Sequence, residues 1–195
     1  MAAELQWDLL PGRSLGDDRF LVAGQLEPAY AVCGDHFDWS LTGDRLTVTV
    51  LNGFGDGLEA ALLTTAAVNA MRNARRSGAN IVEQAELASD AVYSLHGGAA
   101  HVATLLLEID LVGGAIEAVD LEPGDRLLVV SDGVHAAAPN GRAPYGGSAL
   151  LSTLRRTRLQ PATEAVGTVM RSLRDYHAGT DPADDAVTVC LDWRR

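Results

Sequence analysis

Short runs of apolar residues, some alternating with polar ones, predict β-strands in the first third of the chain. Phe37–Leu41 and Leu46–Leu51 show the alternation, whose period of two is typical of a strand with one buried face. The segment between them, Thr42–Arg45, contains a glycine and favours a hairpin turn. A further strand is predicted over Phe20–Ala23, where the run is wholly apolar.

A helical spacing of apolar residues replaces this pattern after Gly57. The predicted buried face of the first helix is formed by Leu58, Ala61, Leu62, Thr65 and Val68, which recur at the period of an α-helix. The second helix is expected to begin at Asn80, whose side chain can cap the exposed amides while Glu83 occupies the reciprocal position. Its predicted face consists of Ile81, Ala85, Ala88, Val92 and Leu95. Because the loop between the helices is short, we expect them to be antiparallel neighbours.

The second half of the chain repeats this order of strands followed by helices. His101–Ile109 and Ala115–Val119 predict another hairpin, and Asp185–Leu191 predicts a final strand. The run Leu127–Val130 is wholly apolar, which favours a central strand buried on both faces. One helix, containing Leu150, Leu154 and Thr157, is expected after Pro144–Gly147, and another is expected from Pro161, with Ala162, Ala165, Val166, Val169 and Leu173 on its inner face. Hairpins and paired helices together favour an α+β sandwich of antiparallel β-sheets covered by helices.

Composition and charge exclude several classes of protein. The 195 residues are 47% hydrophobic and 21% charged, as in a globular protein, and we expect one domain over 1–195 with 1–15 as a lead-in segment. A net charge of −11 disfavours nucleic-acid binding. No apolar run approaches the roughly 18 residues of a membrane span, and the N-terminus lacks the features of a signal peptide, so a cytoplasmic protein without a membrane partner is expected. Cys33 and Cys190 lie in strand-like runs and are interpreted as small buried residues, not as a disulfide framework or zinc site.

Acidic residues recur at the ends of three predicted strands, at Gly34-Asp35, Asp132-Gly133 and Asp184-Asp185. The end of a fourth strand has an amide instead, at Asn52-Gly53. Carboxylates that converge there would repel one another unless a cation neutralised them, and oxygen ligands suit hard divalent cations. Asp-Gly turns are also ordinary hairpin chemistry, so the spacing alone leaves a metal site and a set of turns as alternatives.

A series of short segments spans nearly the whole chain in a characteristic order. The segments are Gln6-x-x-Leu9-Leu10-Pro11, Pro28-Ala29, Gly34–Asp38, Gly53–Ala61, Val102-Ala103-Thr104, Leu121–Asp125, Ser131–Val134 and Asp184–Thr188. This series resembles the SpoIIE/RsbU-type phosphatases, which are bacterial members of the metal-dependent (PPM, type 2C) serine/threonine phosphatases. The resemblance implies two antiparallel β-sheets flanked by helix pairs, with a centre of two Mn²⁺ or Mg²⁺ ions between the sheets.

The resemblance also implies a role for each matched residue. Asp35 would hold one metal, Asp132 and Asp184 the other, and the position of Asn52 would bridge both while the Gly53 carbonyl adds an oxygen ligand. No catalytic side chain beyond the metal centre is implied, because a metal-bridging water attacks the phosphoserine or phosphothreonine directly. Three further acidic residues are expected near the site, namely Asp38, Asp56 and Asp185; for Asp38, a purely structural role is an equal alternative.

Three departures from the family pattern change this expectation. An amide at Asn52 offers one neutral oxygen where a carboxylate would offer two charged ones, so we expect one cation, or none, to bind. Asp56 replaces a histidine and Cys33 a glycine beside the site. Ala115–Val119 also runs almost directly into Leu121, so one sheet is expected to be short of a hairpin.

Two functions follow from the resemblance. The first is a protein serine/threonine phosphatase domain with weakened or absent metal-dependent phosphomonoester hydrolysis. It would act in partner-switching signalling on a phosphorylated regulatory protein, such as an anti-sigma-factor antagonist. The second is a catalytically inactive pseudophosphatase that binds a regulatory protein. Control by a partner, or by a homodimer formed through the N-terminal segment, is a further expectation.

Overall fold

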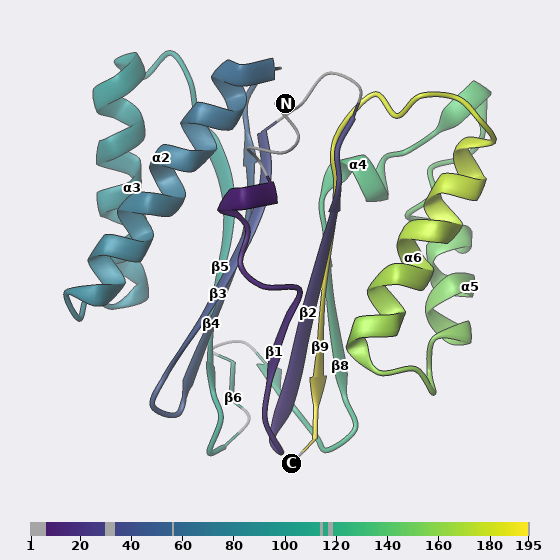
Figure 1. The fold of residues 1–195 in the computed structure, drawn as a ribbon, viewed down its shortest axis with the longest axis horizontal. Coiled ribbons are helices and arrows are strands. Elements are labelled where there is room, and N and C mark those ends of the chain that lie inside the picture. Colours follow the sequence, from purple (N-terminus) through teal and green to yellow (C-terminus); the bar gives the residue numbers. More distant parts are fainter. Residues whose placement is uncertain (1–6, 30–33, 56, 114, 117–118, 195) are drawn as a thin grey trace.

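Two antiparallel β-sheets pack face to face, and a pair of helices covers the outer face of each (Figure 1). The computed structural model describes residues 7–29, 34–55, 57–113, 115–116 and 119–194. One sheet has the order β1-β2-β9-β8, with β1 Ser14–Gly16, β2 Phe20–Glu27, β9 Ala186–Trp193 and β8 Arg126–Val130. The other has the order β3-β4-β5-β6-β7, with β3 Gly34–Thr42, β4 Arg45–Gly53, β5 Val102–Asp110, β6 Ala115–Ile116 and β7 Val119–Asp120. This architecture confirms the predicted α+β sandwich.

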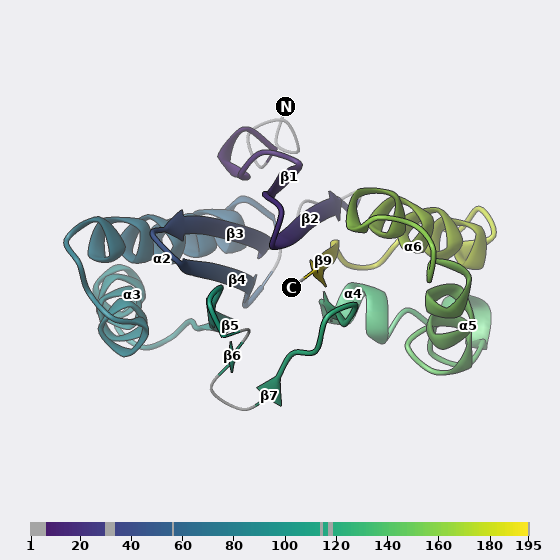
Figure 2. The ribbon, with the colours of Figure 1, turned by 90° about the horizontal axis from the view of Figure 1, so that it is seen from below.

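The helices divide between the two sheets. On the β3–β4–β5 side lie α2 Gly57–Arg76 and α3 Ile81–His96, and on the other side lie α5 Ser148–Arg156 and α6 Ala162–His177. A short helix, α4 Asp132–His135, follows β8, and a 3₁₀ turn follows at Pro139–Gly141. The view from below shows each helix pair stacked on its own sheet (Figure 2). None of the described helices has the length and hydropathy that crossing a membrane requires.

The main core lies between the sheets. Phe20 and Val189 from one sheet pack in the same cluster as Phe37 and Leu46 from the other. Smaller clusters join each helix pair to its sheet; Leu51 packs under α2 and α3, and Ala186 packs under α5 and α6. Burial of these side chains is the main stabilisation of the two layers.

The predicted capping box and the inner face of α6 are confirmed. Asn80 accepts hydrogen bonds from the amides of Val82 and Glu83, and the Glu83 carboxylate accepts one from the Asn80 amide. The predicted inner face of α6 is buried in full, comprising Ala162, Ala165, Val166, Val169 and Leu173. Both predictions rested on local chemistry or on a strongly periodic run, which are the most dependable sequence signals.

The predicted inner face of α2 is wrong except at Val68, which is buried. Leu58 and Leu62 are 61% and 57% exposed, whereas the buried residues are Ala60, Leu63, Thr64, Ala67, Val68, Met71 and Ala74. The helix lies so close to the sheet that the hydroxyl of Thr64 donates to the carbonyl of Gly34 over 2.6 Å. Small side chains fit this contact, so packing distance, and not hydrophobicity alone, selects the face. In α3 the prediction fails in part, because Ala85 and Leu95 are exposed and Gln84 is buried.

Two strand predictions also need correction. β8 was expected in the centre of its sheet but lies at the end of the described order, next to β9 alone. Its apolar run has another cause, because Leu127 and Val129 pack on the inter-sheet core while Leu128 and Val130 face the helix cluster. The predicted second hairpin exists, but β5 pairs with β6 only at Ile109 with Ile116.

Candidate metal centre

Two glycines hold the upper ends of β3 and β4 together. Gly34 pairs with Gly53, and a Cβ added at Gly34 would lie 2.6 Å from the Gly53 carbonyl oxygen. A Cβ at Gly53 would lie 2.3 Å from the hydroxyl oxygen of Thr64. No side chain other than hydrogen fits at either position without displacing the backbone. The register then pairs Asp35 with Asn52, so both side chains stand on the same face of the sheet, towards the inter-sheet space.

A hydrogen bond joins this pair to the opposite sheet. The Asn52 side-chain amide donates to Asp132 Oδ1 over 2.7 Å, and the Gly133 amide donates to the same oxygen over 3.1 Å. Asp132 is the first residue of α4, directly after β8 and Ser131. The structure therefore brings together Asn52 and Asp132, which the sequence only suggested as neighbours.

The two aspartates before β9 occupy different environments. Asp185 is fully buried, and one of its oxygens accepts a 2.6 Å hydrogen bond from the Ala29 amide. Asp184 accepts a hydrogen bond from the Asp185 amide and lines the same cavity of about 380 Å³ as Asp132. A Cβ added at Gly133 would lie 1.8 Å from the Asp185 carbonyl oxygen, so the glycine lets α4 approach this strand entry.

Asp35 is almost completely buried beside the acids of the opposite sheet. It is 1% exposed, and burial raises its pKa to about 8. A hydrogen bond from Ser131 opposes that rise, while the charges of Asp184, Asp185 and Asp132 add to it. The effect of these charges on the Asp35 pKa indicates that the carboxylates share one electrostatic environment.

Ser131 is a site residue to which the sequence prediction gave no role. It is buried, and its hydroxyl oxygen accepts a 3.0 Å hydrogen bond from the Val187 amide in β9. Because the same hydroxyl also acts on the pKa of Asp35 in β3, Ser131 stands between β9 and β3. The only sequence signal was its place directly before Asp132 in the Ser131–Val134 segment.

The acidic residues predicted to lie near the metal ligands do not all lie there in the structure. Asp38 lies three residues after Asp35 on β3, and therefore on the opposite face of that strand. There it forms ion pairs with Arg72 at 2.8 Å and Arg75 at 3.1 Å from α2, which favours the structural alternative. Asp56 and Cys33 lie outside the described residues. Cys190 is buried, as expected, and burial raises the pKa of its thiol to about 12.

The donor set does not fit a pair of cations as it is arranged. A bridging ligand needs oxygen lone pairs for both ions, but Asn52 directs an N–H towards Asp132. Among the described residues, no three His, Cys, Asp or Glu side chains are grouped so as to hold a metal ion. The acids nevertheless stay close enough to influence the pKa of Asp35. The site is thus a set of carboxylates in which an amide hydrogen bond occupies the position where the resemblance implies a bridging ligand.

A comparison with known families identifies the family of the chain. The profile described as Stage II sporulation protein E (SpoIIE) matches residues 42–121 and 115–194. The chain belongs to the SpoIIE family. Asn52, Asp132 and Asp184 fall within the matched ranges, and Asp35 precedes them. No curated protein matches the chain by sequence.

Solved structures share the fold of this SpoIIE-family chain at low sequence identity. The SiaA-PP2C domain of Pseudomonas aeruginosa is 18% identical with a TM-score of 0.80, over 98% of this chain and 94% of that one. The RsbU and RsbW domains of Rv1364c from Mycobacterium tuberculosis are 19% identical with a TM-score of 0.69, over 90% of this chain and 60% of that one. RsbX in complex with magnesium is 14% identical with a TM-score of 0.63, over 92% and 98%. These likenesses establish the PPM-type sandwich.

Proposed function

We propose that this SpoIIE-family domain is a protein serine/threonine phosphatase with weakened or absent metal-dependent hydrolysis. In this proposal it acts on a phosphorylated regulatory protein in partner-switching signalling. The observation that carries it is the 2.7 Å hydrogen bond from the Asn52 amide to Asp132. Compared with a carboxylate, an amide at this position lacks the negative charge and has an N–H donor in place of one of the two ligand oxygens.

The carboxylates that remain support residual cation binding. Asp132 and Asp184 line one cavity, and Asp35 lies beside Asn52 on the facing sheet. In the proposal, Asp132 and Asp184 hold one Mn²⁺ or Mg²⁺ ion, with Asp35 and the Gly53 carbonyl on the far side of Asn52. The fold of RsbX, solved in complex with magnesium, is compatible with such a site. The charge of the missing carboxylate is the main deficit, because two dications at short distance need several anionic ligands.

The test is Mn²⁺-dependent hydrolysis of p-nitrophenyl phosphate by the wild type and Asn52→Asp. We expect slow or undetectable turnover in the wild type and at least about tenfold faster turnover in the variant, since the restored charge stabilises bound cations. Asn69→Asp is the matched control, because it adds the same charge on an exposed position of α2. Calorimetric titration with Mn²⁺ measures binding separately. If Asn52→Asp binds Mn²⁺ no better than the wild type, position 52 is not a metal ligand.

The alternative function is an inactive pseudophosphatase that binds its regulatory partner. The observation in its favour is the same hydrogen bond, because it satisfies Asp132 without a cation. In that case neither the wild type nor Asn52→Asp would turn over substrate. A phosphoserine peptide would then be expected to bind the wild type equally well in EDTA and in Mn²⁺.

A further inference from the structure

The outer edge of β5 is open over most of its length. β5 pairs with β4 along all nine residues, from Val102 with Gly53 to Asp110 with Arg45. On its other side, the described residues contribute only the pairing of Ile109 with Ile116. The stretch from Val102 to Leu107 is therefore a strand edge without a described neighbour, and Leu105 within it is 43% exposed.

The backbone of this edge presents hydrogen-bonding groups outward. At the ends of the β4–β5 ladder, the Phe54 amide donates to His101 and the Leu111 amide donates to Asp44. Hydrogen-bonded pairs alternate along an antiparallel ladder, so the residues at 103, 105 and 107 bond to β4. Thr104 and Leu106 consequently direct their N–H and C=O groups to the open edge. These groups match the requirements of one more strand.

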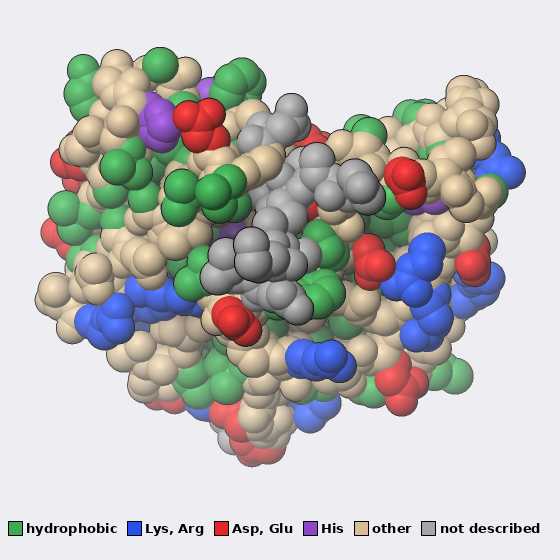
Figure 3. All heavy atoms as spheres, turned by 45° about the horizontal axis from the view of Figure 1, so that its top comes forward, with side chains coloured by type: hydrophobic (Ala, Val, Ile, Leu, Met, Phe, Trp, Pro, Cys, Tyr) green, Lys and Arg blue, Asp and Glu red, His purple; other side chains and the backbone are tan. Residues whose placement is uncertain are grey.

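This strand edge lacks the residues that usually protect an exposed edge from pairing with another strand. The run Val102–Leu107 contains no charged residue and no proline, although natural edge strands commonly use both against unwanted pairing. Figure 3 shows the face turned away from this edge, where hydrophobic side chains on the α2–α3 half lie among charged ones. In a protein with a net charge of −11, an unprotected apolar edge points to a surface that a partner covers.

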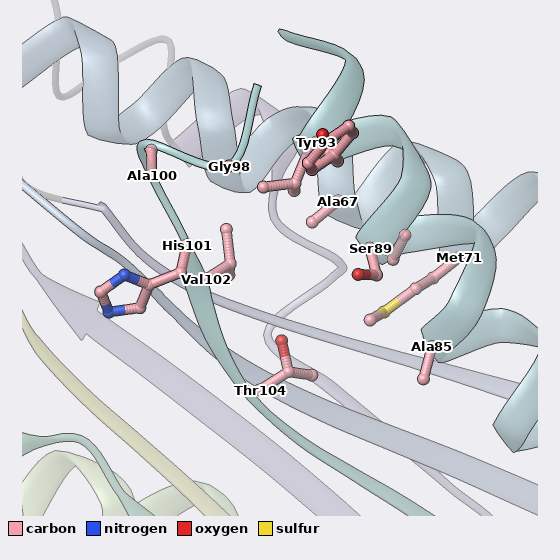
Figure 4. A pocket seen from close by; sticks show the side chains of 12 residues that line it. Ala67, Met71, Ala85, Ser89, Tyr93, Gly98, Ala100, His101, Val102 and Thr104 are labelled. Atoms are coloured by element: carbon pink, nitrogen blue, oxygen red, sulfur yellow. The ribbon is translucent and has the colours of Figure 1, made fainter. Parts of the chain in front are cut away.

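A cavity lies beside the same edge on the helix side. Its volume is about 360 Å³, and Figure 4 shows side chains of β5 projecting towards the two helices around it. The lining includes Met71, Ala85, Ser89, Tyr93, Val102 and Thr104. Successive side chains of a strand point to opposite faces, so alternate residues of an added strand would reach this cavity. The others would cover Leu105 on the inner face.

The charge of α3 selects the kind of strand that fits. Glu83, Glu86 and Asp90 are exposed on this helix, which contains no Lys or Arg. Glu86 and Asp90 directly follow the cavity-lining residues Ala85 and Ser89. A second copy of the chain would bring the same acidic charge to the edge, whereas a basic segment would be attracted.

We propose that the open edge of β5 and the adjoining cavity form a docking site for an extended segment of a partner protein. The segment has apolar side chains at alternate positions and basic residues at its ends, and it adds to the sheet as a strand beside β5. Main-chain hydrogen bonds supply affinity in this binding mode, and the side-chain cavity supplies specificity. The upper end of this edge adjoins the carboxylate cluster, because Ala103 pairs with Asn52, but the docking does not depend on the proposed hydrolysis.

The test uses a fluorescein-labelled peptide of about seven residues that alternates Val and Thr and carries Arg at both ends. A matched peptide carries Glu at both ends. Fluorescence anisotropy with the full chain should show binding of the Arg peptide and at least about tenfold weaker binding of the Glu peptide. Glu86→Gln combined with Asp90→Asn should weaken binding of the Arg peptide towards that of the Glu peptide. No binding of the Arg peptide to the wild type would overturn the proposal.

Backbone variants test the edge itself. Thr104→Pro removes one outward amide without touching a bond to β4, and it should weaken the Arg peptide about tenfold. Thr104→Val retains the amide and should bind like the wild type.

Ser89→Trp tests the cavity. The larger side chain fills it from α3, so it should weaken binding even if Thr104→Pro does not fold. Equal binding by folded Thr104→Pro or by Ser89→Trp would contradict the site, and a wild-type dimer that Thr104→Pro dissociates would show that a second copy occupies the edge.

Discussion

The side chains of Asn52 and Asp132 form a 2.7 Å hydrogen bond between residues separated by 80 positions in the sequence. The bond connects the end of β4 to the start of α4 and so joins the two halves of the sandwich. It also places Asn52, where the resemblance implies a bridging carboxylate, in direct contact with Asp132. A carboxylate at position 52 would lose this hydrogen bond, because it has no N–H to donate.

Asn52→Asp is expected to destabilise the metal-free protein. The new carboxylate would face Asp132 at hydrogen-bond distance without a proton to share, which should lower the free energy of unfolding by about 1 to 2 kcal/mol in EDTA. Mn²⁺ should reverse the loss by binding the folded state. Urea unfolding in both buffers measures this, with Asn69→Asp as the charge control. An equal loss in EDTA and Mn²⁺ would count against a cation at this position.

Asp35 should make the stability of the metal-free protein depend on pH. Its pKa of about 8 lies above the value near 4 of an unfolded Asp, so the folded state binds the proton more tightly. The folded state then loses relative stability as pH rises from about 4 to 8, and the full cost remains above pH 8. Asp35→Asn should therefore be more stable than the wild type at pH 8.5 by roughly a few kcal/mol, and nearly equal at pH 4. Denaturation at both pH values checks this; a constant difference would refute it.

The ion pairs of Asp38 should matter for stability and not for metal binding. Asp38 is buried against Arg72 and Arg75, so Asp38→Ala leaves two partly buried charges without their partner and should cost about 3 to 5 kcal/mol. Glu108→Ala is the control, because it breaks the largely exposed pair with Arg45 and should cost less than about 1 kcal/mol. Chemical denaturation gives both values. A change in Mn²⁺ affinity for folded Asp38→Ala would instead connect Asp38 to the site.

Gly133→Ala should disturb the entry to β9. The added methyl group would overlap the Asp185 carbonyl oxygen, so α4 or the strand entry must move, at a cost of about 1 to 3 kcal/mol. Gly12→Ala is the control, since its nearest contact would be 4.0 Å away. Amide exchange at Ala29, which donates to Asp185, reports whether the entry has shifted. Unchanged stability and exchange would contradict the close approach.

Local sequence chemistry predicted the elements better than their packing. The capping box at Asn80 and the inner face of α6 were correct because each depends on residues close in sequence. The inner face of α2 was wrong because Leu58 and Leu62 are more hydrophobic than Ala60 and Thr64. Only the close approach of the helix to the sheet, through Thr64 and Gly34, explains why the smaller residues face inward.

The sequence by itself determined the α+β class, the order of the main strands and helices, and the presence of an amide at position 52. These properties depend on periodicity, turns and residue identity, which are local. The tertiary structure decided that Asn52 meets Asp132, that Ser131 bonds to Val187, that Asp38 faces the helices, and that most of the outer edge of β5 has no neighbour among the described residues. Each of these depends on the register and separation of segments far apart in the chain, and no local pattern fixes that geometry.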